Sequence, residues 1–422
     1  ASKITGIPSN KIYDLAKKIV NNRTMITGAW ALQRQQYGEQ PHWMISVLAC
    51  MLGQIGLPGG GFGLGYSAEN GIGNPVEHHK WPALDQFKNP VSTFIPVART
   101  SDMLLNPGDI FSYNGKDIMY PDIKLVYWAG GNPFHHQMDL KKLTKAFKKP
   151  DTVIVNEIWW NSLARHADII LPTSTSLERN DISIKHWDQT ISPMHKAIDP
   201  IGDSKSDYDI FSGIASKLNI EKKFTEGRNE DEWLRYLWNQ ARDSASKANF
   251  NLPEFDKFWK GGFQEVLSPK KQTILMEDFR KDPIKNPLPT PSGKIEIFSQ
   301  TISDFNYKDC PGHPVWLEQD EWLGSVLTKD YPLQLISGQP ANKLHSQLDN
   351  GSESLKDKIQ GREPIKINPK DALFRDLKNG DIVEVYNKRG KCLAGVIISN
   401  EVMKGVVFLP VGAWYDPIEN GG

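Results

Sequence analysis

The chain has 422 residues, which is long enough for two or three domains. Its 50 basic and 50 acidic residues balance, so its charge gives no reason to expect nucleic acid or an anionic membrane as a partner. No apolar run approaches the roughly 18 residues that cross a bilayer, and direct membrane insertion is not expected. Cys50, Cys310 and Cys392 lie far apart and match no CxxC pattern of a zinc, iron–sulfur or redox site.

The N-terminal part predicts three elements: a helix over 8–21, a strand over 24–26 and an apolar helix over 43–55. A polar turn with Trp30, Gln33 and Arg34 follows the strand. This turn is either part of a ligand site or a solvated surface on which Arg34 pairs with an acid such as Glu39. Residues 74–121 show no periodicity and are expected to be irregular.

The stretch from Ile123 to Asp181 organises the rest of the chain. Three apolar runs alternate with two helix-like segments, in the order 125–128, 138–148, 152–155, 159–166 and 169–171. Unbroken apolar runs separated by helices are typical of a parallel sheet that is covered on both faces.

Polar side chains gather where these runs end. They are Asn132, His135, His136, Asn156, Glu157, Glu178, Arg179, Asn180 and Asp181. Any one of them could simply cap a loop. Because ligands of parallel sheets bind beyond the carboxyl ends of the strands, three polar strand ends in succession favour a ligand cleft.

The later part of the chain changes character. It predicts helices over 208–218 and 231–246, a surface-wrapping segment over 250–300, and an alternating strand within Pro291–Ile297. From Tyr331 onward short alternating runs dominate, with a hairpin turn at Asn387–Gly390. A polar turn early in this part contains Ser337, Gln339, His345, Ser346 and Gln347.

The predicted fold is α/β. An α/β region over 1–300 with doubly wound parallel sheet is joined by a linker over 301–330 to a β-barrel module over 331–422.

Several long strings resemble one family. GAWALQRQQYGEQPHWM, YWAGGNPFHHQMD, ARHADIILPTSTSLERND and KLHSQLDNGS are similar to segments of the molybdopterin oxidoreductases of the dimethyl sulfoxide reductase family. The nearest branch is that of trimethylamine-N-oxide reductases and biotin or methionine sulfoxide reductases. The resemblance covers nearly the whole chain in the family's order, and it implies a double-psi-like barrel at the C-terminus.

The resemblance implies molybdenum bis(molybdopterin guanine dinucleotide) as cofactor, and oxygen removal from an N-oxide or S-oxide as reaction. The implied substrates are trimethylamine N-oxide, dimethyl sulfoxide, biotin sulfoxide and methionine sulfoxide. A c-type cytochrome is the implied electron donor. The implied location is the periplasm, with the cytoplasm as the alternative.

The resemblance also implies roles for residues. Trp30 and Arg34 would face the substrate. The remaining positions would contact the dinucleotides: Gln33, Gly131, Asn132, Pro133, His135, His136, Asn156, Glu157, Arg179, Asn180, Asp181, Ser337, Gln339, His345, Ser346 and Gln347. Phosphates are bound by Arg, Asn, Gln and backbone N–H groups, and a guanine edge is bound by a carboxylate.

In the resembled family the serine that ligates molybdenum would precede Ala1, so no residue of this sequence is assigned as a metal ligand. The chain is therefore expected to be a fragment that is inactive by itself. Two alternatives stay open. A nicotinamide-dependent dehydrogenase is disfavoured because no GxGxxG leads from a strand into a helix. A non-catalytic subunit with the same fold would keep the turns without the metal.

Overall fold

The computed structural model describes residues 1–63, 65–66, 72, 81–184, 190–265 and 273–418. Contacts between residues divide the chain into two compact units, each formed by two stretches of sequence. The first unit comprises Ala1–Pro90 and Ser174–Leu317, and the second comprises Val91–Thr173 and Glu318–Gly422. The division predicted from the sequence instead gives consecutive segments, with boundaries at residues 300 and 331. The two units do not test that division, and it stays a prediction.

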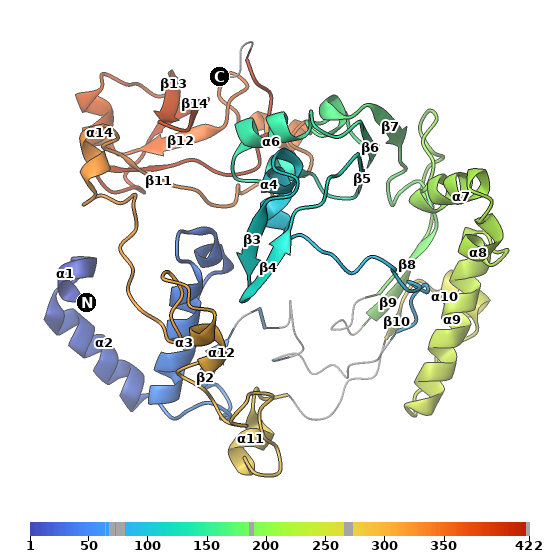
Figure 1. Ribbon diagram of the computed structural model, residues 1–422, viewed down its shortest axis with the longest axis horizontal. Helices are drawn as coiled ribbons and strands as arrows, with labels where there is room; N and C mark the ends of the chain where they lie inside the picture. The colour runs from blue at the N-terminus through green and yellow to red at the C-terminus, as the bar shows by residue number, and fades with distance from the viewer. Residues whose placement is uncertain (64, 67–71, 73–80, 185–189, 266–272, 419–422) are drawn as a thin grey trace. The chain divides into compact units, whose positions relative to one another are not determined.

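The second unit contains the predicted parallel sheet. β5 (Leu125–Ala129), β6 (Thr152–Glu157) and β7 (Ile169–Pro172) pair side by side in that order, and both pairings are parallel (Figure 1). The register aligns Ala129 with Asn156 and Glu157 with Pro172. The carboxyl ends of all three strands therefore share one edge of the sheet, as their unbroken apolar runs predicted.

The two helix-like segments between these strands differ in outcome. The first forms α6 (Leu140–Ala146), which begins where the Asp139 carboxylate accepts a hydrogen bond from Lys142 N at 3.0 Å. The predicted helix over 159–166 is wrong, because only the short 3₁₀ turn η3 (Ala164–His166) forms there. The Asn161 side chain accepts hydrogen bonds from two following backbone N–H groups and so competes with a regular helix.

The prediction of irregular structure over 74–121 is wrong for part of that stretch. α4 (Thr100–Leu105) is followed by a hairpin of β3 (Ile110–Tyr113) and β4 (Lys116–Met119). Asn114 and Gly115 both have positive φ, at 49° and 71°. This is the backbone of a tight hairpin turn, for which Asn-Gly is the strongest short sequence signal.

The parallel sheet and α6 share one apolar core. Leu143 and Val155 are fully buried in it, together with Phe134 and Phe147, whose rings meet edge to face with centroids 5.4 Å apart. Since Phe134 follows the end of β5 by five residues, this core fixes the turn that leaves the sheet at that point.

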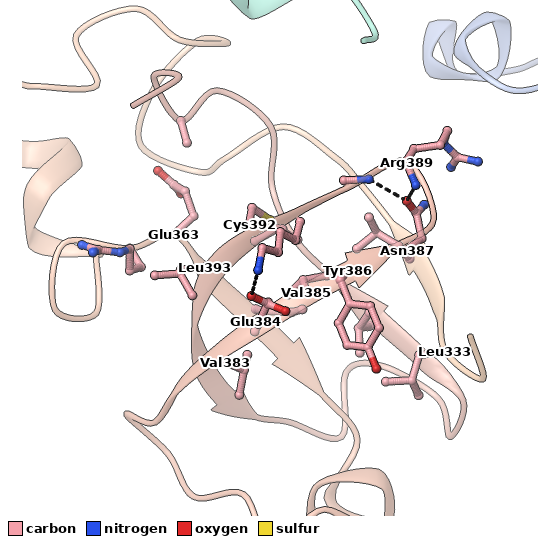
Figure 2. A pocket seen from close by; sticks show the side chains of 18 of the residues that line it. Leu333, Glu363, Val383, Glu384, Val385, Tyr386, Asn387, Arg389, Cys392 and Leu393 are labelled. Carbon is pink, nitrogen blue, oxygen red and sulfur yellow. Dashed lines mark hydrogen bonds and ion pairs between the residues drawn. The ribbon is translucent and has the colours of Figure 1, made fainter. Parts of the chain in front are cut away.

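The rest of the second unit is a five-stranded sheet that curls into a half-barrel (Figures 1 and 2). Its order is β11 (Gln334–Ile336), β15 (Val406–Phe408), β12 (Pro364–Ile367), β14 (Gly390–Ile398) and β13 (Ile382–Asn387). The predicted hairpin is confirmed, because Asn387 pairs with Gly390. α13 (Ser352–Lys356) and α14 (Pro369–Phe374) connect the strands.

The first unit is mainly helical in its described parts. Its elements are α1 (Ser2–Thr5), α2 (Ser9–Asn21), β1 (Met25–Thr27), η1 (Trp30–Arg34), α3 (Glu39–Met51), β2 (Gly61–Gly63), β8 (Asp181–Ser183), β9 (Thr190–Met194), α7 (Asp207–Lys217), α8 (Glu221–Thr225), α9 (Glu230–Lys247), α10 (Phe255–Gly261), β10 (Gln264–Glu265), α11 (Glu277–Lys281) and α12 (Gln300–Asp304). The helices predicted over 8–21, 208–218 and 231–246 are confirmed as α2, α7 and α9. The helix predicted over 43–55 is present as α3, but it begins and ends four residues earlier.

Two predictions for the later part of this unit are wrong. The segment after α9 does not only wrap the surface, since Phe255 and Phe258 are buried against that helix. Pro291–Ile297 forms turns and bends instead of a strand. There the Glu296 carboxylate accepts a hydrogen bond from Ser292 N at 2.9 Å, which folds the segment back on itself.

Among the residues that the structure describes, no helix is both long enough and apolar enough to cross a membrane.

Leu143→Ala should lower the free energy of unfolding by about 2–5 kcal/mol, because Leu143 is fully buried between α6 and the parallel sheet. Lys141→Ala, at an exposed position of the same helix, is the control and should leave that free energy nearly unchanged. Urea unfolding of both variants measures the difference. Equal midpoints for the two variants would show that this core does not form as described.

Candidate functional site

The end of β5 forms a tight turn with two buried polar atoms that have no hydrogen-bond partner in the part of the chain that the structure describes. Gly130 and Gly131 both have positive φ, at 77° and 74°, and bring the chain to Asn132, which caps α5 (Pro133–His136). Asn132 Oδ1 accepts from Phe134 N at 2.9 Å, whereas Asn132 Nδ2 has no hydrogen-bond partner among the described residues. The same holds for His135 Nε2. A buried polar atom without a partner marks a place for a ligand or a water.

The other two strand ends carry polar groups as well. After β7, the hydroxyl of Thr173 is buried and has no hydrogen-bond partner in the described part of the chain. At the end of β6, Asn156 is buried and accepts a hydrogen bond from the Tyr127 hydroxyl at 2.8 Å. The next residue, Glu157, is only half-buried, and its Oε1 accepts from the backbone N–H of Ile158 at 2.9 Å.

The polar turn after β11 lies against the end of β5. The His136 and His345 rings lie with centroids 6.1 Å apart, and the His135 ring is nearly parallel to the Trp414 indole at 6.2 Å. Within the turn, Gln339 Nε2 and His345 Nδ1 are 3.0 Å apart. The structure thus brings together two turns that are more than 200 residues apart in sequence, and both were predicted to bind the same ligand.

Two further predicted residues of this turn are located as well. The Ser337 hydroxyl donates to Leu409 O at 2.9 Å, and Ser346 O accepts from the Trp414 indole N–H at 2.9 Å. Gln347 is exposed. Pro133, by contrast, is buried, and it is the first residue of α5.

The segment after β15 holds the two turns together, and none of its residues was among the predicted binding residues. Trp414 contacts both turns, and Tyr415 stacks on Phe134 with centroids 5.9 Å apart. The Ser162 hydroxyl donates to Tyr415 O at 2.8 Å. Aromatic residues after an apolar run were the available signal, but nothing local in the sequence indicates which elements they contact.

Burial controls the protonation of His135. Burial first, and the nearby charge of His136 second, lower the pKa of His135 from 6.5 to about 4, while Asp349 opposes the shift. At neutral pH the imidazole is therefore neutral. A neutral imidazole has one ring nitrogen that can accept a hydrogen bond and one that can donate, so His135 can offer either role to a ligand.

The remaining predicted residues lie in the first unit, in two separate groups. Trp30, Gln33 and Arg34 share the 3₁₀ turn η1, and all three are exposed. Arg34 forms no ion pair with Glu39 or with any other residue that the structure describes, so the proposed surface salt bridge is not observed.

The second group surrounds the start of β8. The Arg179 guanidinium pairs with the Asp181 carboxylate. Asn180 accepts from Lys196 N at 2.9 Å through its side-chain oxygen. Glu178 accepts from Thr175 and from Ile201 N, and the Thr175 hydroxyl is the first cause of its lowered pKa. Glu178 therefore supports the loop itself.

A large hollow of about 1710 Å³ lies on the concave side of the half-barrel (Figure 2). Apolar side chains such as Leu333, Val383 and Val385 form much of its wall, and Glu384 pairs with Lys391 across neighbouring strands at 2.9 Å. None of the predicted binding residues lines it. No group of His, Cys, Asp and Glu side chains within the described ranges could hold a metal ion.

Two family models match the chain. The model of molybdopterin oxidoreductases matches residues 10–217, and that of the molybdopterin dinucleotide binding domain matches residues 333–422. The two turns around His136 and His345 each fall within one of these matches.

Curated relatives match the chain from end to end. It is 46% identical to a trimethylamine-N-oxide reductase of Haemophilus influenzae, with 100% of this chain and 53% of the relative covered. It is 45% identical to a biotin sulfoxide reductase of Cereibacter sphaeroides, with 100% and 56% covered. The chain thus spans about half the length of these relatives.

Among solved structures, acetylene hydratase from Pelobacter acetylenicus is similar with a TM-score of 0.54. The sequences are 19% identical, and the match covers 71% of this chain and 38% of that one. At this identity the similarity concerns the fold alone.

The lowered pKa of His135 predicts a pH dependence of stability. Between pH 6.5 and about 4 the unfolded chain binds a proton that the folded chain does not, so the free energy of unfolding should fall as the pH falls through this window. His135→Gln should reduce the slope of the free energy of unfolding against pH by the amount that corresponds to about one bound proton. His313→Gln, at an exposed histidine, is the control and should keep it. Urea unfolding of the cofactor-free chain at several pH values measures the slopes, and equal slopes for both variants would contradict the burial of His135.

Proposed function

We propose that this chain, which belongs to the molybdopterin oxidoreductases, acts in the reduction of N-oxides or S-oxides at a molybdenum bis(molybdopterin guanine dinucleotide) centre. The observation that carries the proposal is the identity of 45–46%, along the whole chain, with reductases of trimethylamine N-oxide and of biotin sulfoxide. The double-psi form of the C-terminal barrel belongs to this proposal, and the curled five-stranded sheet supports it.

The strand-end turns fit such a cofactor chemically. Asn132 Nδ2, His135 Nε2 and the Thr173 hydroxyl are buried without hydrogen-bond partners among the described residues, at the edge of a parallel sheet where ligands bind. A pterin dinucleotide carries phosphate, amide and ring-nitrogen groups that can pair with an amide, a neutral imidazole and a hydroxyl. Leaving such atoms unpaired costs about 1–3 kcal/mol each, and a polar ligand would remove that cost.

The residues of the second unit would hold the dinucleotides. Gly131, Asn132 and His136 would meet one part of the ligand from the end of β5, and His345 and Gln347 would meet it from the polar turn. Asn156, Ser337, Gln339 and Ser346 would complete this set. Glu157 would accept from a guanine edge through the carboxylate oxygen that is not bonded to the backbone.

The exposed groups of the first unit would serve the substrate and the phosphates. Arg34 has no ion-pair partner within the described residues and could donate to the oxide oxygen, which develops negative charge as its bond to sulfur or nitrogen breaks. Trp30 would shield that region from water, and Gln33 would contact the cofactor. Arg179 and Asp181 are paired with each other, so a phosphate would compete with Asp181 for the guanidinium.

When bound, the cofactor would supply two-electron oxygen-atom transfer chemistry, and the protein would supply binding, orientation and electrostatics. The proposed location is the periplasm, and the proposed electron donor is a c-type cytochrome. Both rest on the resembled branch of reductases.

Metal analysis tests the proposal directly. The purified full-length protein should contain about one molybdenum per chain with pterin guanine dinucleotide, and it should reduce at least one of trimethylamine N-oxide, dimethyl sulfoxide, biotin sulfoxide and methionine sulfoxide. A protein with no molybdenum and no activity on this panel would instead be a non-catalytic member of the fold.

Arg34→Leu should lower kcat on the order of 10²-fold while the molybdenum content stays the same, because a donor to the developing charge is lost. Lys18→Leu removes an exposed positive charge from α2 and is the matched control. Steady-state kinetics on the best oxide, with metal analysis of each preparation, measures the effect. Unchanged kcat for Arg34→Leu would remove Arg34 from the site.

A further inference from the structure

The polar turn between β11 and α13 has little regular structure to hold its shape. Residues 337–351 contain no helix and no strand, and His345 and Leu348 both have positive φ, at 52° and 53°. This conformation is unfavourable for side-chain-bearing residues and persists only where the surroundings enforce it. Something other than local preference must therefore fix the backbone that presents His345.

A buried cluster of four charges closes the two ends of this turn. The Lys343 ammonium contacts the Asp349 carboxylate, and it lies 2.6 Å from Glu363 Oε1. Lys358 Nζ lies 2.8 Å from Asp349 Oδ2. The Lys343 side chain is only 2% exposed and that of Asp349 only 5%. Two cations and two anions leave the cluster without net charge.

The cluster joins the turn to rigid neighbours. Lys343 precedes His345 by two residues and Asp349 follows Gln347 by two, so the contact between them spans the base of the turn. Glu363 leads into β12, and its backbone oxygen accepts from Gly395 N of β14 at 2.9 Å. The cluster is thereby anchored to the five-stranded sheet.

The same cluster also positions the segment after β15. Asp349 Oδ2 accepts from Trp414 N at 3.0 Å, and the Trp414 indole donates to Ser346 O at 2.9 Å. Gly412 has φ 102° and leaves no room for a Cβ, which would collide with the carbonyl oxygen of His345. Because Trp414 lies on the His135 ring, one set of contacts aligns both turns of the site.

The contact between Lys343 and Asp349 favours the charged form of both side chains. Burial opposes the charge of Lys343, but the hydrogen bonds that its ammonium donates to Asp349 and Glu363 outweigh burial and raise the pKa of the ammonium. Burial likewise opposes the charge of Asp349, while Lys343 and Lys358 lower the pKa of its carboxyl. A buried ion cluster of this kind contributes little net stability compared with apolar packing, and the fixing of one arrangement is the role that such clusters are known to serve in some proteins.

We propose that Lys343 is a positioning residue, which touches no ligand and, through Asp349, holds the His345–Gln347 turn and Trp414 in the arrangement that meets the pterin dinucleotide. The proposal rests on the proposed function for the identity of the ligand. The rigidity of the turn, in contrast, can be measured without any cofactor.

The first arm of the test is amide hydrogen exchange of the cofactor-free full-length protein. In Lys343→Met, amides of residues 344–348 should exchange at least tenfold faster, while those of β12 and β14 keep their protection. Lys366→Met breaks the exposed Lys366–Glu401 pair of the same sheet and should change neither. Unchanged exchange at 344–348, or an equal loss of protection across the sheet, would overturn the positioning role.

The double variant Lys343→Met with Glu363→Gln separates positioning from stability. It removes one charge of each sign, so the cluster stays neutral, but the base of the turn remains open. Its Tm should recover toward that of the parent, whereas fast exchange at 344–348 should persist. Recovery of both the Tm and the slow exchange at 344–348 would show that Lys343 only balances the charge of the cluster and does not position the turn. The double variant also allows this decision if Lys343→Met alone does not fold.

The second arm measures pterin retained by the purified protein, from the fluorescence of its oxidised form. Retention should fall several-fold in the double variant and stay at the parent level in Lys366→Met. Full retention in the double variant would contradict the link to the dinucleotide. Absence of pterin from the parent protein would contradict the proposed function and the claim that this turn meets a pterin dinucleotide. The exchange data would still decide whether Lys343 keeps the turn rigid.

Discussion

Buried polar atoms without partners are the constraint around which the second unit is arranged. Asn132 Nδ2, His135 Nε2 and the Thr173 hydroxyl are all withdrawn from solvent at the carboxyl edge of one parallel sheet, within the described part of the chain. Folding tolerates few such groups, because each loses its bonds to water. Their gathering at a single edge marks that edge as a place where a polar ligand or ordered water completes the hydrogen bonds, and a polar ligand is the occupant that we propose.

The surrounding contacts hold these atoms in place before any ligand arrives. Leu143 and Phe134 pack in the core beside the end of β5 and fix that end. Trp414 stacks with the His135 ring and fixes the polar turn after β11. The ion cluster of Lys343 and Asp349 then ties that turn to the half-barrel. A preorganised site of this kind spends less of its binding energy on ordering its own loops.

The sequence predicted the elements whose signals are local. Unbroken apolar runs located β5, β6 and β7, and turn residues located the hairpin at Asn387–Gly390, because period and turn chemistry act over a few residues. The strand-end rule also led to Asn132 and His135, and it would equally have led to Thr173, which directly follows β7. The hairpin at Asn114–Gly115 was missed although its turn signal is present.

What the sequence could not predict depends on contacts over long separations. Trp414 lies on a histidine 279 residues earlier. The partners of Lys343 are Asp349, in the loop before α13, and Glu363, directly before β12, and no periodicity encodes the side-chain geometry that joins them. The Asn161 side chain accepts from the backbone and so interrupts an expected helix; Asn is a residue type that competes with helices in this way, but the sequence does not show whether it does so at a given position. The roles of Arg34 and Arg179 toward a ligand remain proposals for the same reason.

The most direct test of the central claim is hydrogen exchange of the wild-type full-length protein with and without its bound pterin cofactor. The account predicts that bound cofactor slows exchange in the segments 130–137 and 344–348 together, while α9 (Glu230–Lys247), which carries no proposed contact, is unchanged. Slowing elsewhere, with no change in either of these two segments, would contradict the assignment of this sheet edge as the cofactor site.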